Sequence, residues 1–156
     1  MGRVVGFIFA CAPWLVPGKK LFVNKKVVCF RHPTPSYDNH ILVIPRKIAA
    51  TPLKIKDSVF TDVIRAAEEL VDKYIDKDDI KILCINGGSR QDVKQAHFHL
   101  FAVKNPPEIF YDGNVLDFPN INGKLKKLYD ENNLKHKGYT IKMILGSDTL
   151  FKVDYK

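Results

Sequence analysis

The stretch from Gln95 to Phe101 reads Gln-Ala-His-Phe-His-Leu-Phe and alternates polar with apolar residues. A β-strand turns successive side chains to opposite faces, so this alternation predicts a strand with Gln95, His97 and His99 on one face. The apolar residues on the other face would pack against a core and keep the polar row aligned. The pattern therefore predicts a half-buried sheet that presents two imidazoles and an amide in one row.

Two other segments carry polar residues of the kind found in binding sites. A turn from Asn86 to Val93 reads Asn-Gly-Gly-Ser-Arg-Gln-Asp-Val and follows an apolar run. Its glycines would let backbone N–H groups approach an anion such as phosphate, although a plain hairpin loop has a similar composition. His40 begins an apolar strand that Pro45 ends, because proline has no N–H to donate to a sheet.

The residues alone leave three interpretations of the histidine row open. It is an ordinary solvated sheet face, a metal site that Cys84 and His40 would have to complete, or a site for catalysis and substrate binding. A lone histidine is more often structural than functional. The three segments together favour a common functional site.

These motifs resemble the signature of the histidine-triad family of nucleotide-binding proteins, nucleotidyl hydrolases and transferases. That signature is His-φ-His-φ-His-φ-φ, where φ is apolar, after a Gln-x-Val-x stretch and a glycine-rich phosphate loop. An earlier histidine stands in a His-φ-φ-φ-Ile-Pro-Arg/Lys strand, which residues 40–46 match. Residues 91–94, Gln-Asp-Val-Lys, set the register of the triad. The three triad positions are then Gln95, His97 and His99.

Two positions depart from the family pattern within the region of resemblance, about residues 7–103. Gln95 stands at the first triad position, and an amide forms hydrogen bonds but does not carry a proton. His32 stands eight residues before His40, where the nucleotide-binding branch of the family usually has an acidic residue on the ribose hydroxyls. These departures bear on the rate of turnover and on the preference for a nucleoside.

The resemblance implies that His97 attacks an α-phosphorus and forms a transient nucleotidyl-imidazole, while a backbone carbonyl near Gln95 fixes the tautomer of the ring. His99 would donate to phosphoryl oxygens or to the leaving group, and His40 would act from the neighbouring strand. Gln95 completes the candidate catalytic set. The candidate substrate-binding residues are Asn86, Gly88, Ser89, Arg90, Gln91, Asp92, Val93 and His32. No metal and no other cofactor is expected.

We therefore expect a phosphoramidase-like enzyme that hydrolyses or transfers nucleotidyl groups, with a purine nucleotide, a phosphoramidate or a dinucleoside polyphosphate as its partner. One alternative is a nucleotide-binding module that lost turnover through Gln95. Another is a metal-binding protein that uses His97, His99 and His40. Turnover of an adenosine phosphoramidate separates the first two, and loss of binding in a chelator would indicate the third.

The length, cysteine content and hydropathy of the chain argue against several other classes of protein. A chain of 156 residues predicts one domain over residues 1–156. No apolar stretch reaches the roughly 18 residues of a membrane span. The odd number of cysteines, Cys11, Cys29 and Cys84, favours reduced thiols in the cytoplasm over a disulfide framework. Residues 3–12 resemble a signal peptide, with a charged residue before a short apolar run, but the family resemblance places them inside the domain.

The formal charge of +8 comes from 25 basic and 17 acidic residues. A positive field speeds encounter with a polyphosphate and also favours nonspecific contact with nucleic acid. The lysine pairs are spread along the chain without the interleaved aromatic residues of single-strand binders. We therefore expect a basic surface without nucleic acid as a partner.

The patterns predict an α+β, histidine-triad-like fold. It would have an antiparallel sheet of about five strands, a long helix packed on it, and a C-terminal extension over about residues 104–156. The expected strands are Leu21–Val23, Val27–Phe30, Ile41–Ile44, Ile80–Ile85 and Ala96–Val103. Asp57 or Ser58 would cap a helix to about Ile75. Its buried stripe would be Val59, Val63, Ala66, Ala67, Leu70 and Tyr74.

The extension begins with an expected loop that includes Gly113, Asn114, Asn120 and Gly123. A short helix over Lys124–Asn132 should follow, and then a hairpin of strands 139–145 and 149–153 about Gly146-Ser147-Asp148. We also expect a homodimer, because family members usually pair edge to edge and the triad strand would otherwise present an unguarded edge. The extension should pack on the core or on the partner subunit.

Overall fold

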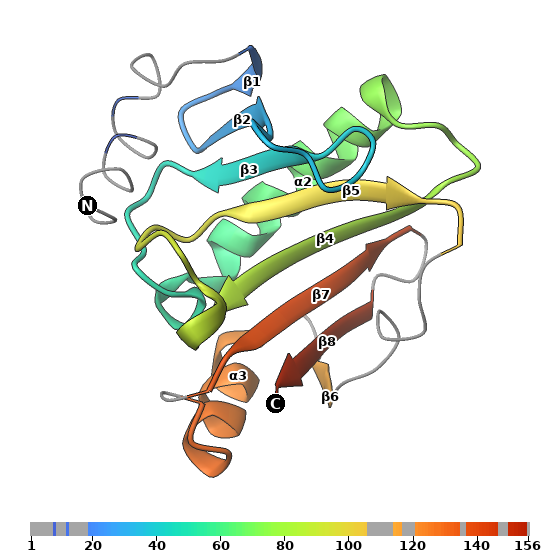
Figure 1. The fold of residues 1–156 in the computed structure, drawn as a ribbon. Coiled ribbons are helices and arrows are strands. Elements are labelled where there is room, and N and C mark those ends of the chain that lie inside the picture. Colours follow the sequence, from blue (N-terminus) through green and yellow to red (C-terminus); the bar gives the residue numbers. More distant parts are fainter. Residues whose placement is uncertain are drawn as a thin grey trace.

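The chain forms an α+β fold around one antiparallel sheet, as the computed structural model shows (Figure 1). The structure describes residues 8, 12, 19–105, 114–116, 121–134, 137–146 and 150–155. Strands in this part of the chain follow the order β1-β2-β3-β5-β4-β7-β8-β6. They are β1 Lys20–Val23, β2 Val27–Arg31, β3 Ile41–Pro45, β4 Ile80–Gly87, β5 Phe98–Val103, β6 Asn114–Leu116, β7 Tyr139–Leu145 and β8 Leu150–Tyr155. The helices are α2 Asp57–Tyr74 and α3 Ile121–Glu131, with short 3₁₀ turns η2 Pro52–Lys54 and η3 Gly88–Arg90.

The expected α+β class and antiparallel sheet are confirmed. The five strands expected from the alternation correspond to β1 to β5, and the expected C-terminal hairpin corresponds to the paired strands β7 and β8. The sheet is wider than expected, because β6 pairs with β8 in a segment whose sequence indicates a loop. Three residues are too few to show a period of two. The turn residues Ser147 and Asp148, strand residue Thr149, Cys11 and most of residues 3–12 lie outside the described part of the chain.

Helix α2 packs on one face of the sheet (Figure 1). Its buried residues are Phe60, Val63, Ala66, Ala67 and Leu70, whereas Val59 and Tyr74 are only partly buried. The expected cap at Asp57 or Ser58 is wrong. Lys56 occupies the N-cap position without a side-chain hydrogen bond, and Asp57 already lies in the first turn, where its charge complements the helix dipole.

The core between α2 and the sheet contains Phe98 and Leu100 of β5 together with Phe60 of α2. The Phe60 and Phe98 rings meet edge to face, with 5.6 Å between their centroids. Because side chains alternate along a strand, His99 of β5 lies on the opposite sheet face, away from α2. The apolar half of the motif thus anchors the strand that carries the histidine.

Strand β5 is paired on both sides within the chain, with β3 on one side and β4 on the other. The other side of β4 pairs with β7 over seven residue pairs, from Lys81 with Leu145 to Gly87 with Tyr139. The expectation that the triad strand needs an edge guard from a second subunit is therefore wrong. In the described part of the chain, the outer strands are β1 and β6. None of the helices described there is long and apolar enough to span a bilayer.

Candidate active site

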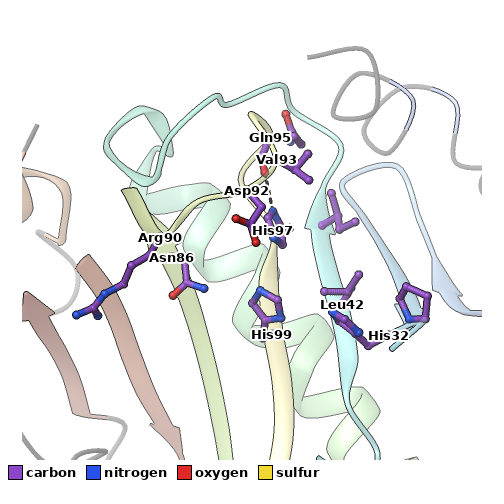
Figure 2. Close-up of a pocket in the computed structure, with 11 residues that line it drawn as sticks. His32, Leu42, Asn86, Arg90, Asp92, Val93, Gln95, His97 and His99 are labelled. Atoms are coloured by element: carbon purple, nitrogen blue, oxygen red, sulfur yellow. Dashed lines mark hydrogen bonds between the residues drawn. The ribbon is translucent and has the colours of Figure 1, made fainter. Parts of the chain in front are cut away.

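A pocket of about 250 Å³ lies on the sheet face opposite α2 (Figure 2). Ligand pockets usually have volumes of roughly 300 to 1,000 Å³, so this one is at the small end. Its lining residues are His32, Pro33, Leu42, Ile44, Asn86, Arg90, Asp92, Val93, Gln95, His97 and His99. The wall from β3 is apolar, and the wall from β4 and β5 is polar.

His97 precedes β5, and its ring is held by the main chain. Its Nδ1 lies 2.8 Å from the carbonyl oxygen of Gln95. A carbonyl only accepts, so Nδ1 carries the proton and Nε2 carries the lone pair. Burial is the largest influence and lowers the pKa of His97, although the Gln95 carbonyl and Asp92 act in the opposite direction. At neutral pH the ring is therefore a neutral imidazole with a nucleophilic nitrogen.

His99 and His40 form a directional chain of hydrogen bonds. The N–H of Ser36 donates to Nδ1 of His40 at 3.3 Å, so the proton of neutral His40 is on Nε2. That Nε2 lies 3.0 Å from Nδ1 of His99, which accepts and leaves the His99 proton on its own Nε2. Burial, and to a lesser extent the neighbouring histidines, lower the pKa of His40 to about 4 and that of His99 to about 3. His99 is thus a neutral N–H donor on the pocket wall.

Gln95 lines the same pocket as His97 and His99, but its side chain bonds to the main chain and not to an imidazole. It is 1% exposed, and its Oε1 accepts from the N–H of Ala49 at 3.2 Å. Its Nε2 donates to the carbonyl oxygens of Pro45 and Lys47 at 3.1 and 3.3 Å. Ala96, just before β5, is buried in the same core as Phe98 and Leu100, so the alternation extends to the residues that precede the strand. Gln95 ties the segment after β3 to the entry of β5.

The glycine-rich loop supplies lining residues and residues that hold its shape. Among the expected binding residues, Asn86, Arg90, Asp92, Val93 and His32 line the pocket, whereas Gly88, Ser89 and Gln91 do not. Gly88 and Ser89 belong to the turn η3, and Gly88 has a φ of 61°, which favours glycine. Gln91 donates through Nε2 to the carbonyl oxygens of Ala50 and Val93, both at 2.8 Å.

Some pocket residues were not among those expected from the sequence. Leu42 and Ile44 share the face of His40 on β3, so the strand period would have found them. Thr140 of β7 contacts two lining residues: it accepts from Nη1 of Arg90 at 2.9 Å and donates to Oδ1 of Asn86 at 2.8 Å. No local pattern marks this threonine.

His32 stacks on His40, with ring centroids 4.2 Å apart and planes inclined by 14°. His32, His40 and His99 each offer a ring nitrogen, and these atoms lie within 4.8 Å of one another. However, Nδ1 of His32 accepts from the N–H of Thr34, as Nδ1 of His40 does from Ser36. A metal-binding histidine usually donates from its second ring nitrogen, so these tautomers suit an anion or a lone pair better than a cation. His97 is not part of this cluster.

Comparisons with known proteins identify the family and the fold. The HIT domain family matches residues 15–105. Adenosine 5'-monophosphoramidase HNT1 of Saccharomyces cerevisiae is 29% identical over 116 residues, which cover 72% of each chain. A histidine triad protein from Clostridium difficile has 25% identity and a TM-score of 0.57, covering 69% of this chain and 95% of that one. Yeast Ap4A phosphorylase Apa2 in complex with AMP has 11% identity, a likeness of fold alone, with a TM-score of 0.61 over 99% of this chain and 64% of that chain.

Proposed function

We propose, since the chain belongs to the HIT domain family, that it is a nucleotidyl hydrolase or transferase acting on the α-phosphate of a nucleotide. The observation that carries the proposal is the hydrogen bond between Nδ1 of His97 and the carbonyl of Gln95. It leaves a lone pair on Nε2 of a neutral ring in a pocket. A nucleophile of this kind needs no general base to remove a proton before it attacks.

In the first step, Nε2 of His97 forms a bond to the α-phosphorus, and the bond from that phosphorus to the leaving group breaks. The leaving group departs with the electron pair. The positive charge that the ring acquires is stabilised by the Gln95 carbonyl at Nδ1. The N–H of His99 would donate to a phosphoryl oxygen or to the leaving atom, in line with its tautomer.

In the second step, water or another acceptor attacks the same phosphorus and the bond to Nε2 breaks. A hydrolysis releases the nucleoside monophosphate and restores neutral His97, and the attacking water loses a proton to solvent. His40 acts indirectly, because its Nε2–H holds His99 in the donor tautomer. Gln95 supports the site through its backbone and through its bonds to residues 45–49.

The two walls of the pocket suggest how a substrate lies. The apolar wall of Pro33, Leu42 and Ile44 suits a nucleoside, and the polar wall of Asn86, His97 and His99 suits phosphates. The yeast relative is an adenosine 5'-monophosphoramidase, and one structural neighbour is in complex with AMP. We therefore propose an adenosine nucleotide as the first substrate to test.

The two alternatives have less support. A binding module without turnover would need Gln95 to impair the chemistry, but its side-chain amide is bonded to the main chain of residues 45–49 and not to His97. A metal-binding protein would need the opposite tautomers at His32 and His40. Both alternatives predict that adenosine phosphoramidate is not turned over.

A test of the function combines turnover with detection of the intermediate. Adenosine 5'-phosphoramidate and diadenosine tetraphosphate are each mixed with the protein, and AMP is measured over time. An alkaline quench followed by mass spectrometry of peptides should reveal one adenylyl group on His97, absent in His97→Ala. No turnover of either substrate and no adduct would reject the proposal. Retained activity in a chelator would count against a metal mechanism.

The homodimer and the cytoplasmic location also stay proposals. The family resemblance supports the homodimer and an unguarded edge does not, because β5 pairs with β3 and β4, and β4 also pairs with β7. Light scattering at micromolar concentration should give twice the 17.8 kDa chain mass for a dimer. The location agrees with the buried thiols of Cys29 and Cys84.

A further inference from the structure

Thr140 connects the C-terminal hairpin to the polar wall of the pocket. It lies on β7 directly opposite Asn86 of β4, so the two side chains project from the same face of the sheet. Its Oγ1 is 2.9 Å from Nη1 of Arg90 and 2.8 Å from Oδ1 of Asn86. One hydroxyl therefore joins two residues that line the pocket.

The chemistry of the three groups sets the direction of these hydrogen bonds. A guanidinium only donates, so the hydroxyl oxygen of Thr140 accepts from Arg90. The single hydroxyl hydrogen is then available to the amide oxygen of Asn86, which accepts it. This arrangement fixes which way the Asn86 amide is turned: its oxygen faces Thr140 and its NH₂ faces the opposite way. Figure 2 shows that nitrogen on the side of the histidines.

We propose that Thr140 is a positioning residue that presents the NH₂ group of Asn86 to the phosphate of the substrate. The inference rests on the proposed function, because it needs a phosphate beside His97. Without the Thr140 hydroxyl, the Asn86 amide has no fixed orientation. In its flipped orientation, it would turn an oxygen toward an anionic phosphoryl group and repel it.

Close contacts between the hairpin and the loop support a fixed geometry for Thr140. A Cβ atom at Gly88 would collide with the carbonyl oxygen of Lys137, and one at Gly138 would collide with the side chains of Ser89 and Arg90. The main chain at Lys137 and Gly138 therefore lies in direct contact with the glycine-rich loop. The hydroxyl of Thr140 is therefore held at a constant distance from Asn86.

The test compares Thr140→Val, Thr140→Ser, Asn86→Ala and the double variant Asn86→Ala with Thr140→Val. Valine keeps the shape and the strand preference of threonine but removes the hydroxyl. Thr61→Val is the matched control, because the Thr61 hydroxyl donates to the Asp57 carbonyl on α2, away from the pocket. The readouts are kcat and KM with adenosine 5'-phosphoramidate, AMP binding by calorimetry, and the midpoint of thermal unfolding.

We expect Thr140→Val to lower kcat/KM about tenfold and to weaken AMP binding. This is the effect of losing one hydrogen bond from the Asn86 amide to the charged phosphate. Thr140→Ser should stay within about twofold of the wild type. In the Asn86→Ala background, Thr140→Val should have no further effect on kcat/KM, because it acts through that amide. A purely structural role would instead lower the unfolding midpoint and add to the effect of Asn86→Ala.

Two other outcomes are distinguishable. If the wild type is active and Thr140→Val matches it, or if the two substitutions act additively, the inference is wrong while the proposed function stands. If the wild type neither binds AMP nor turns over the substrate, the proposed function is wrong, and the inference fails with it.

Discussion

The two sides of the pocket hold their polar groups in different ways. On the β3–β5 side, buried neutral imidazoles are oriented by main-chain groups and by one another, as in the bond between His40 and His99. On the β4–β7 side, the Asn86 amide is oriented by the Thr140 hydroxyl, and neither group ionises. The geometry of the first side therefore depends on protonation, and that of the second side depends on the position of a hairpin.

The largest expected effect is on the β3–β5 side, at the nucleophile. We expect His97→Ala to lower turnover by at least about a thousandfold, because no covalent route remains. AMP binding should stay within about tenfold, since both walls of the pocket remain. Single-turnover rates and calorimetry measure the two effects. Near-normal turnover would reject the assignment, whereas partial rescue of His97→Gly by added imidazole would support it.

The second-largest expected effect is on stability, at the buried amide of Gln95 on the β3–β5 side of the pocket. Gln95→Ala removes the partners of the Ala49 N–H and of two carbonyl groups, at a residue that is 1% exposed. We expect it to lower the free energy of unfolding by about 3 kcal/mol. Gln95→His should also destabilise, because an imidazole has two nitrogens for three partners. Urea unfolding measures both, with Thr61→Val as control, and unchanged stability would contradict the role of the amide.

A change of pH should separate the two sides directly. The pKa values of His40 and His99 are lowered to about 4 and 3, so the unfolded chain binds more protons than the folded chain below the ordinary value of 6.5. Stability must then fall as the pH drops through 6.5 toward 4, by roughly 2 kcal/mol for each of the two histidines between pH 7 and pH 5. Thr140→Val should keep this slope and His99→Gln should reduce it. Equal slopes in both variants would contradict the contrast between the two sides.

The smallest expected effect is on the β4–β7 side, at the donor to Thr140. Arg90→Lys keeps the charge and a donor, but a flexible ammonium does not hold the position that Nη1 has on the rigid guanidinium, so kcat/KM should fall about threefold. Steady-state kinetics with adenosine 5'-phosphoramidate measure it. A loss as large as that of Asn86→Ala would mean that Arg90 contacts the substrate itself. The β4–β7 side would then hold the substrate through a charged group as well as through the Asn86 amide.

Local patterns in the sequence predict some of these features, and long-range contacts determine the others. Strands β1 to β5 and the pocket residues on them are encoded by local periodicity, because a strand that packs one face on α2 must alternate. Thr140 carries no such mark, since its partner Asn86 is 54 residues away. The partners of the Gln95 amide are likewise 46 and 50 residues away along the chain, so no local pattern reveals them. The edge pairing of β4 depends on a long-range partner, which no pattern within β4 reveals.

The pairing of β4 with β7 has a consequence for the order in which the protein is made. Synthesis proceeds from the N-terminus, so the histidines emerge from the ribosome well before Thr140, which follows Asn86 by 54 residues. Until β7 emerges, the nascent chain carries the nucleophile but presents an open β4 edge that other chains could pair with. A chaperone that shields this edge during translation would therefore act before Thr140 orients the amide of Asn86.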